Sequence, residues 1–249
     1  MSGHSKWANI KNRKERQDAQ RGKAFTKVTR EIMMAAREGG PEPASNFRLR
    51  MAIEKAKEVN MPNENIQRAI KRGAGLGDEG ECYEEVRYEG YGPGGVAILL
   101  DIFTDNRNRT ASEIRHLFSR YGGNLGESGC VAWMFDQKGL LVLERTQPAL
   151  AGLAEDDVMM AALEAGAEDF TADDEVYEII TSPEAFSEVQ QALTERLKVK
   201  FAVAELTMIP KNMIEIGDKE AQQLAKLVAA LEEHDDVQDV HLNTELKGA

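Results

Sequence analysis

YEEVRYEGYGPGGVAILLDIF, residues 83–103, contains two β-strand patterns joined by a glycine-rich turn. Polar and apolar side chains alternate over residues 83–91, which is typical of a strand with one exposed face, whereas residues 96–103 are almost continuously apolar, which indicates a buried strand. The intervening GYGPGG, residues 90–95, matches the G-x-G-x-x-G pattern of dinucleotide sites. That pattern requires a helix after the glycines, and here a strand follows, so we predict a hairpin connection and no cofactor.

A second unit lies farther along the chain, in the order strand, helix, strand, strand, helix, strand. This is the order of the ferredoxin-like split fold, so the unit is complete by itself. The expected strands are residues 140–143, 169–171, 176–180 and 202–209, and the expected helices are residues 158–165 and 182–197.

The strands of residues 83–103 need further partners, because two strands alone are marginally stable. A last helix, which Asp218 is expected to cap, and a short strand at residues 237–242 are too short to form a domain by themselves. We therefore predict a multi-domain α and α+β fold in which a ferredoxin-like α+β domain is inserted into a discontinuous one. The predicted boundaries are 1–75 for a basic helical bundle, 76–133 with 208–249 for the discontinuous domain, and 134–207 for the inserted domain.

Three helices are expected within the first 75 residues. Apolar residues recur at steps of three and four over residues 23–37, and four basic residues fall within roughly 80° on the opposite face. These four are Lys23, Lys27, Arg30 and Arg37. The next helix is expected to begin near Ser45 or Asn46, and the third to run from Pro62 to Gly73. The first helix should therefore present a basic face to solvent.

Charge is unevenly distributed along the 249 residues, whose net charge is -12. Residues 1–73 carry 17 Lys and Arg against 8 Asp and Glu, whereas residues 74–249 carry 14 against 35. The first thirty residues alone hold nine basic residues, two acidic residues and Trp7. Positive charge concentrated in one arm of an acidic protein indicates contact with a polyanion.

A smaller cluster of arginines follows the buried strand, in TDNRNRT at residues 104–110. Asn and Arg at a loop–helix junction suit phosphate contacts, and Thr110 with Glu113 forms a capping-box pattern for the helix. The alternative is a salt-bridge patch between domains, and the sequence leaves both open. The candidate nucleic-acid-binding residues are Lys6, Trp7, Lys11, Arg13, Lys14, Arg16, Arg21, Lys23, Lys27, Arg30, Arg107 and Arg109.

The sequence contains no pattern for catalysis or metal binding. Cys82 and Cys130 form no CxxC pair, the four histidines lack metal-ligand spacing, and no hydrolase or metalloprotease motif occurs. We therefore expect no enzyme, no cofactor, no metal and no small-molecule substrate. Because a run of about 18 apolar residues and a signal-peptide pattern are both missing, we also expect no membrane contact and a cytoplasmic protein.

Several long motifs are shared with one known family. They are GHSKWANIKNRK, RGKAFTK, NMPNENIQRAIKRG, YEGYGPGGVAI, DNRNRTASEIRH, GGNLG, EAGAEDF and MIPKN. With them the chain resembles the YebC/PmpR family across essentially its full length. Within the opening motif it departs from the family only at Ser2 and Asn12, where many relatives have Ala and His. The resemblance implies three domains, one helical and two α+β, with the last inserted in the second.

The same resemblance implies a cytoplasmic regulator of gene expression. Family members are commonly described as DNA-binding transcriptional regulators. A mitochondrial relative is described as a translational activator of cytochrome c oxidase, and bacterial members have also been linked to ribosomes. The resemblance therefore specifies the fold more closely than it specifies whether the protein binds DNA or the ribosome.

The sequence is compatible with three functions. The first is a DNA-binding transcriptional regulator, although no helix stands out with a compact set of Asn, Gln and Arg for reading bases. The second is an RNA- or ribosome-associated translation factor, in which the arm contacts rRNA phosphates and Trp7 either stacks on a base or packs in the helical core. The third is a protein–protein adaptor whose arm binds acidic surfaces. The sequence predicts neither the base preference nor the oligomeric state.

Overall fold

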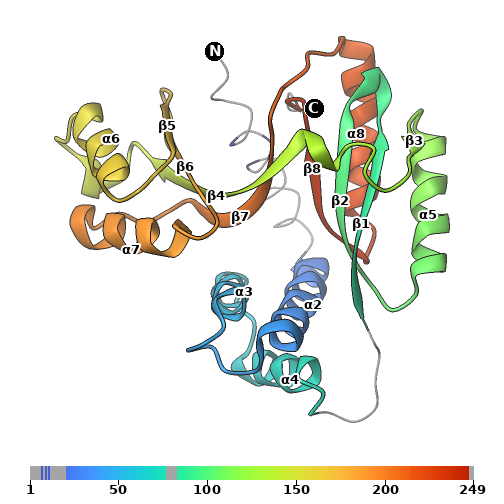
Figure 1. Cartoon of the computed structure of the whole chain (residues 1–249), viewed down its shortest axis with the longest axis horizontal. Helices are drawn as coiled ribbons and strands as arrows, with labels where there is room; N and C mark the ends of the chain where they lie inside the picture. Colours follow the sequence, from blue (N-terminus) through green and yellow to red (C-terminus); the bar gives the residue numbers. More distant parts are fainter. Residues whose placement is uncertain (1–6, 8, 10, 12–20, 77–82, 247–249) are drawn as a thin grey trace. The chain divides into compact units, whose positions relative to one another are not determined.

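The computed structural model describes residues 7, 9, 11, 21–76 and 83–246, and within residues 21–76 it describes side chains from residue 24 onward. A helical region is followed by an α+β region that contains two four-stranded antiparallel sheets (Figure 1). The chain divides into two compact units. The helical region and the first sheet belong to one unit, and the second sheet belongs to the other.

The helical region consists of α2 (Arg21–Gly39), α3 (Phe47–Glu58) and α4 (Asn63–Gly73), which confirms the three predicted helices. Asn46 caps α3, because its side chain accepts a hydrogen bond from the Leu49 amide at 3.0 Å. The same side chain donates to the Ala35 carbonyl at 2.6 Å and so ties α3 to α2. At the end of α4, a Cβ on Gly73 would lie 2.1 Å from the Met33 carbonyl oxygen, so this close approach to α2 requires glycine.

The first sheet has the strand order β3-β1-β2-β8, and all its neighbours are antiparallel. Its strands are β1 (Glu84–Tyr91), β2 (Ala97–Thr104), β3 (Asn124–Leu125) and β8 (Val237–Leu242). The turn between β1 and β2 is a short 3-10 segment, Pro93–Gly95, which confirms the predicted hairpin. Buried β2 and half-exposed β1 also agree with their sequence patterns. The helices α5 (Arg107–Arg120) and α8 (Asp218–Glu232) contact each other and this sheet.

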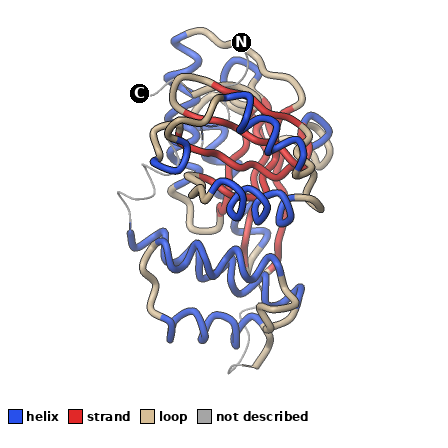
Figure 2. Tube along the Cα trace, turned by 90° about the vertical axis from the view of Figure 1, so that its left-hand side faces the viewer, coloured by secondary structure: helices blue, strands red, loops and turns tan. Residues whose placement is uncertain are grey.

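The second sheet has the order β5-β6-β4-β7 and is also antiparallel (strands red in Figure 2). Its elements follow the predicted order: β4 (Phe135–Glu144), α6 (Glu155–Glu164), β5 (Asp169–Ala172), β6 (Val176–Thr181), α7 (Phe186–Leu197) and β7 (Val203–Pro210). A Cβ on Gly139 would lie 2.2 Å from the Thr181 hydroxyl and 2.4 Å from the Phe186 ring. Glycine in β4 therefore lets β6 and α7 pack closely against it.

The two predicted helix-capping residues, Thr110 and Asp218, are wrong, and α7 begins at Phe186, four residues after its predicted start. Helix α5 begins at Arg107 with Asn106 as its cap, whose side chain accepts from the Arg109 amide at 3.1 Å. Thr110 lies inside the helix and is fully buried, so it does not cap α5. Helix α8 is preceded by Gly217 at the cap position, and Asp218 is its first residue. An acidic residue there still interacts favourably with the positive end of the helix.

Candidate nucleic-acid interface

Trp7 is an anchor of the N-terminal arm. Its indole packs against the hydrophobic core of the second sheet, a cluster that includes Leu140 and Val203, and its backbone amide donates to the Glu178 carboxylate at 2.9 Å. Asn9 bonds the Thr244 carbonyl and the Leu246 amide, both at 2.9 Å. Trp7 was expected to pack in the core of the helical region, and this prediction is wrong: it packs against the second sheet. Its side chain is half-buried in this contact.

Four candidate residues of the arm, Lys6, Arg13, Lys14 and Arg16, lie outside the described residues. Lys11 is described and remains accessible: its Nζ lies 3.5 Å from a Glu175 carboxylate oxygen and 5.9 Å from the centre of the Trp7 ring. An exposed pair of this kind contributes little to stability, so the Lys11 ammonium is available to another anion.

The basic face of α2 is less exposed than its sequence pattern predicts. Arg21 and Lys23 lie on α2, where the structure describes their backbone only. Lys27 is only 9% exposed, so the prediction of a solvent-facing position is wrong. The Arg30 side chain is 14% exposed, lies 3.1 Å from an Asp236 carboxylate oxygen and donates to the Asp235 carbonyl. The Arg30 guanidinium also lies over the Tyr83 ring.

Asp236 is the centre of a buried polar network. Its carboxylate accepts hydrogen bonds from the Thr110 hydroxyl at 2.7 Å and from Arg109 at 2.9 Å, in addition to the ion pair with Arg30. The Thr110 hydroxyl also lies 2.8 Å from the Thr104 hydroxyl. Burial by itself raises the pKa of Asp236, but the hydrogen bonds from Thr110 and Arg109 and the two positive charges outweigh it and hold the pKa below its usual range.

The two arginines proposed from the TDNRNRT motif differ in their surroundings. Arg109 bonds Asp105 at 2.8 Å as well as Asp236, and these hydrogen bonds raise its pKa. Arg107 is 58% exposed and lies 3.7 Å from Glu84. A pocket of about 970 Å³ over this network is lined by more carboxylates than basic groups. Its acidic lining favours the salt-bridge interpretation over phosphate binding at Arg109.

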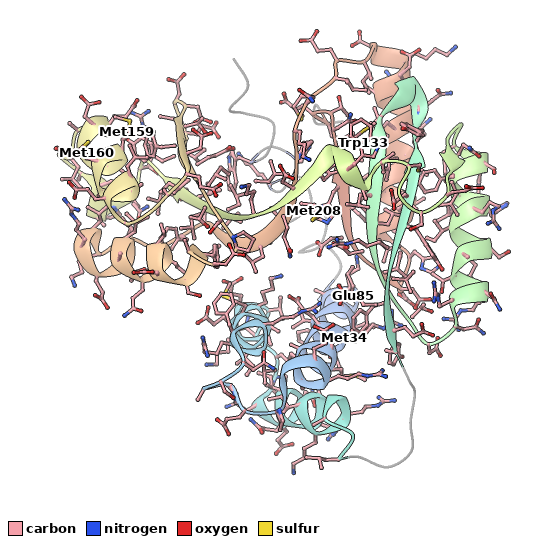
Figure 3. All side chains as sticks on the ribbon, viewed as in Figure 1. Met34, Glu85, Trp133, Met159, Met160 and Met208 are labelled. Carbon is pink, nitrogen blue, oxygen red and sulfur yellow. The ribbon has the colours of Figure 1, made fainter. Side chains whose placement is uncertain are left out.

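Other basic residues of the helical region are also paired with carboxylates. Arg48 lies 2.5 Å from Glu38 and 3.0 Å from Glu85, which is labelled in Figure 3. Lys55 lies 3.0 Å from Glu31. Part of the positive charge of this region is therefore neutralised within the protein.

Helix α4 carries two basic residues that are not paired in this way. Ile66, Ala69 and Ile70 are buried, and the remaining face is exposed. Within the described part of the chain, Arg68 and Lys71 on that face form no ion pair with any carboxylate. Neither residue is among the nucleic-acid contacts predicted from the sequence, although the spacing of the apolar residues indicates which face is outward.

Trp133 is an exposed aromatic residue that is also not among the contacts predicted from the sequence (Figure 3). It is 64% exposed, and its indole N–H donates to the Cys130 carbonyl at 3.1 Å. The Tyr91 hydroxyl donates to the same carbonyl at 3.2 Å. Both rings are thus fixed at their polar ends, and the indole face of Trp133 is accessible to a planar ligand.

The loop that carries Trp133 is held by Glu89. The buried Glu89 carboxylate accepts hydrogen bonds from the amides of Gly129 at 2.6 Å, Val131 at 2.8 Å and Ala132 at 2.7 Å. Burial raises the pKa of Glu89, but the three amide hydrogen bonds outweigh it, and the net pKa is lowered. Glu89 is therefore ionised at neutral pH and fixes the loop.

Replacing Glu89 by Gln should lower the free energy of unfolding by about 2 kcal/mol, because an amide NH₂ cannot accept from a backbone N–H. The matched control is Glu127→Gln, an exposed site on the same loop, which should change it by less than about 0.5 kcal/mol. Urea unfolding at neutral pH measures both. Equal stabilities of the two variants would contradict the role given to Glu89.

The described residues give little support for other kinds of site. Among them, no three His, Cys, Asp or Glu side chains come together in a way that could hold a metal ion. No helix in the described ranges has the length and apolar character needed to span a membrane. Cys130 is a free thiol whose pKa is raised by burial and by the nearby Glu89 charge.

Comparison with known proteins identifies the class of protein. Residues 5–76 match the model of the TACO1/YebC protein N-terminal domain, and residues 83–244 match that of the TACO1/YebC second and third domain. The chain belongs to the TACO1/YebC family, which confirms the resemblance seen in its motifs. Membership also confirms the expectation that it is not an enzyme.

Individual relatives are similar over nearly their whole length. The chain is 54% identical over 246 residues to a "Probable transcriptional regulatory protein" of Natranaerobius thermophilus, covering 99% of this chain and 97% of the relative. It is 56% identical to a protein of the same name from Pelotomaculum thermopropionicum, covering 99% and 100%. The crystal structure of a conserved hypothetical protein from Aquifex aeolicus superposes with a TM-score of 0.81 at 50% identity, covering 93% of each chain.

Proposed function

We propose that the protein is a nucleic-acid-binding regulator of gene expression that binds DNA and controls transcription. The observation that carries this proposal is the separation of charge, with 17 basic and 8 acidic residues in residues 1–73 against 14 and 35 in the remainder. The acidic part as a whole is repelled by a polyanion, so the basic part is expected to supply most of the contact surface. The names of the curated relatives agree with a role in transcription.

The proposed contacts are mainly with phosphates. Lys6, Lys11, Arg13, Lys14 and Arg16 supply the arm, and Arg107 supplies an exposed guanidinium on α5. Contacts of this kind fix the position of a protein on nucleic acid but carry no sequence information directly. The buried Lys27 and the paired Arg30 and Arg109 contribute less, because their surroundings already engage or cover them.

Trp133 favours a second candidate, binding to RNA or to the ribosome in translation. An exposed indole can stack on an unpaired base, and single-stranded loops are the usual targets of sequence-specific RNA recognition. Trp7 does not support this candidate, because its ring packs against the second sheet.

Salt dependence tests the phosphate contacts. If about six Lys and Arg side chains contact duplex phosphates, the logarithm of the affinity should fall with a slope of about −5 against the logarithm of salt concentration. The affinity should then fall roughly a thousandfold between about 50 and 200 mM salt, whatever the DNA sequence. Fluorescence anisotropy with a labelled duplex measures this slope. Failure of the protein to bind any duplex or RNA would reject the proposed function.

The target is tested by crosslinking in cells followed by sequencing of the bound DNA and RNA. Enrichment at promoters supports transcriptional control. Crosslinks to rRNA together with co-sedimentation with ribosomes support the second candidate. If neither promoters nor rRNA are enriched, the result supports the third function, a protein–protein adaptor.

We also infer the domain division that this function uses. The strand order β5-β6-β4-β7 supports a ferredoxin-like domain at residues 134–207, inserted into a domain formed by residues 76–133 and 208–249. Residues 1–75 form the basic helical domain in this division. We place the protein in the cytoplasm, where its nucleic-acid targets lie.

A further inference from the structure

The positive charges of the helical region are not equally available. Arg30, Arg48 and Lys55 are paired with carboxylates of their own unit, and Lys27 is buried. A guanidinium already held by a carboxylate must lose that partner before it can bind a phosphate. The available basic side chains of this region therefore lie elsewhere.

Helix α4 carries two of them close together, Arg68 and Lys71. Its 11 residues bury one narrow stripe and expose the rest of the surface. Asn65, Gln67, Arg68 and Lys71 are all exposed. Their spacing places Arg68 and Lys71 opposite the buried stripe, with Asn65 and Gln67 on the two flanks of the exposed face. Glu64 shares this face in the first turn, so the basic character increases toward the end of the helix.

We propose that α4 enters the major groove of duplex DNA and contacts both phosphates and base edges. This inference rests on the proposed function and adds a contact element to it. A helix with its side chains is about 10–12 Å across, and the major groove of B-form DNA is about 12 Å wide. The 11 residues of α4 extend over about 16 Å, which is enough for several turns of side chains in one groove.

The residue types on α4 fit this geometry. Asn and Gln make paired hydrogen bonds with adenine, and Arg and Lys make them with guanine or bind phosphates. Asn65 and Gln67 are the base-reading candidates, and Arg68 and Lys71 are the phosphate or guanine contacts. A-form RNA has a deep, narrow major groove that side chains cannot read, so the same helix favours duplex DNA over duplex RNA.

The outer face of α4 can be changed without disturbing its packing. The helix is held to α2 through Ile66, Ala69, Ile70 and the close approach at Gly73. None of the proposed contact residues belongs to that core. Variants of the exposed face should therefore fold like the wild-type protein, and circular dichroism with thermal melting checks this.

The main test is the double variant Arg68→Glu with Lys71→Glu. Its affinity for duplex DNA should fall at least about tenfold, and the salt slope should become shallower by roughly two, one for each lost phosphate contact. The matched control is Lys57→Glu with Lys226→Glu, which makes the same charge change at exposed sites outside α4 and should lower affinity less than about threefold. Equal losses in the two variants would overturn the proposal.

Base reading is tested with Asn65→Ala and Gln67→Ala together. This variant should keep the salt slope of the wild type and bind a different set of sequences when selected from a random duplex library. An unchanged set of sequences would overturn base reading by α4. Wild-type binding to duplex RNA as tight as to duplex DNA of the same length would overturn the groove assignment.

These outcomes separate the inference from the function on which it rests. If the wild type binds duplex DNA and the α4 variants bind equally well, only the role of α4 is rejected. If the wild type binds no nucleic acid, both the proposed function and the role of α4 are rejected.

Discussion

Reversal of charge at Lys6, Lys11, Arg13 and Lys14, each to Glu, is expected to abolish binding to duplex DNA and to RNA alike. Each change removes one cation and adds one anion at a place where a phosphate would lie. At about 100 mM salt, the loss of four contacts together with four new repulsions should weaken binding by more than about a thousandfold. Fluorescence anisotropy with labelled duplex and single-stranded probes measures the loss.

The control for this variant carries the same change of net charge elsewhere. Lys57, Lys200, Lys219 and Lys226 are all exposed, and their replacement by Glu should lower affinity far less than the arm variant does. Both variants should unfold at the same temperature as the wild type, within a few degrees, because surface substitutions of this kind are nearly neutral. Undiminished binding by the arm variant would remove the arm from the proposed interface.

Local sequence patterns predicted most of the fold. The alternation in β1, the apolar run of β2 and the amphipathic spacing of α2–α4 each reflect a contact surface that repeats along one element. The order of the elements of the second sheet was also correct, since each strand and helix had its own pattern. The two-residue strand β3 was missed because so short an element has no period to detect.

The burial of charged residues could not be predicted in the same way. Lys27 and Arg30 lie opposite the apolar residues of α2, so periodicity assigned them to solvent. Arg30 is instead paired with Asp236, which lies 206 positions later in the chain. Likewise, Thr110 had the spacing of a capping residue, but its hydroxyl bonds the same distant carboxylate. A pattern confined to one helix contains no information about such a partner.

The unpaired basic residues of α4 are likewise not recognisable from the sequence of the helix by itself. Arg68 and Lys71 are no more basic in sequence than Arg48 or Lys55. In the folded protein, Arg48 is paired with Glu38 and Glu85, and Lys55 is paired with Glu31. Among the described residues, no carboxylate lies within ion-pair distance of Arg68 or Lys71. The available positive surface is therefore a property of the folded chain.

Replacement of Asp236 by Ala is expected to lower the free energy of unfolding by about 3–5 kcal/mol. The Asp236 side chain is 4% exposed, and its removal would leave the Arg30 guanidinium without its ion pair and the buried Thr110 hydroxyl without one of its partners. Asp235→Ala is the matched control: this neighbour is exposed, and only its carbonyl, which the substitution retains, bonds Arg30. That variant should change stability by about 0.5 kcal/mol or less.

The pH dependence of the same pair of proteins distinguishes charge from packing. Because the pKa of Asp236 is lower in the folded protein than in the unfolded chain, the unfolded chain takes up the proton first as the pH falls. The stabilisation by Asp236 is thus fully present above the unfolded pKa of about 3.9 and is lost as the pH falls through the folded value. The isosteric variant Asp236→Asn should therefore be less stable than the wild type at pH 7, with a difference that shrinks in acid. Urea unfolding at a series of pH values measures it, and a difference that stays constant down to low pH would show that the shape of the side chain, rather than its charge, stabilises this network.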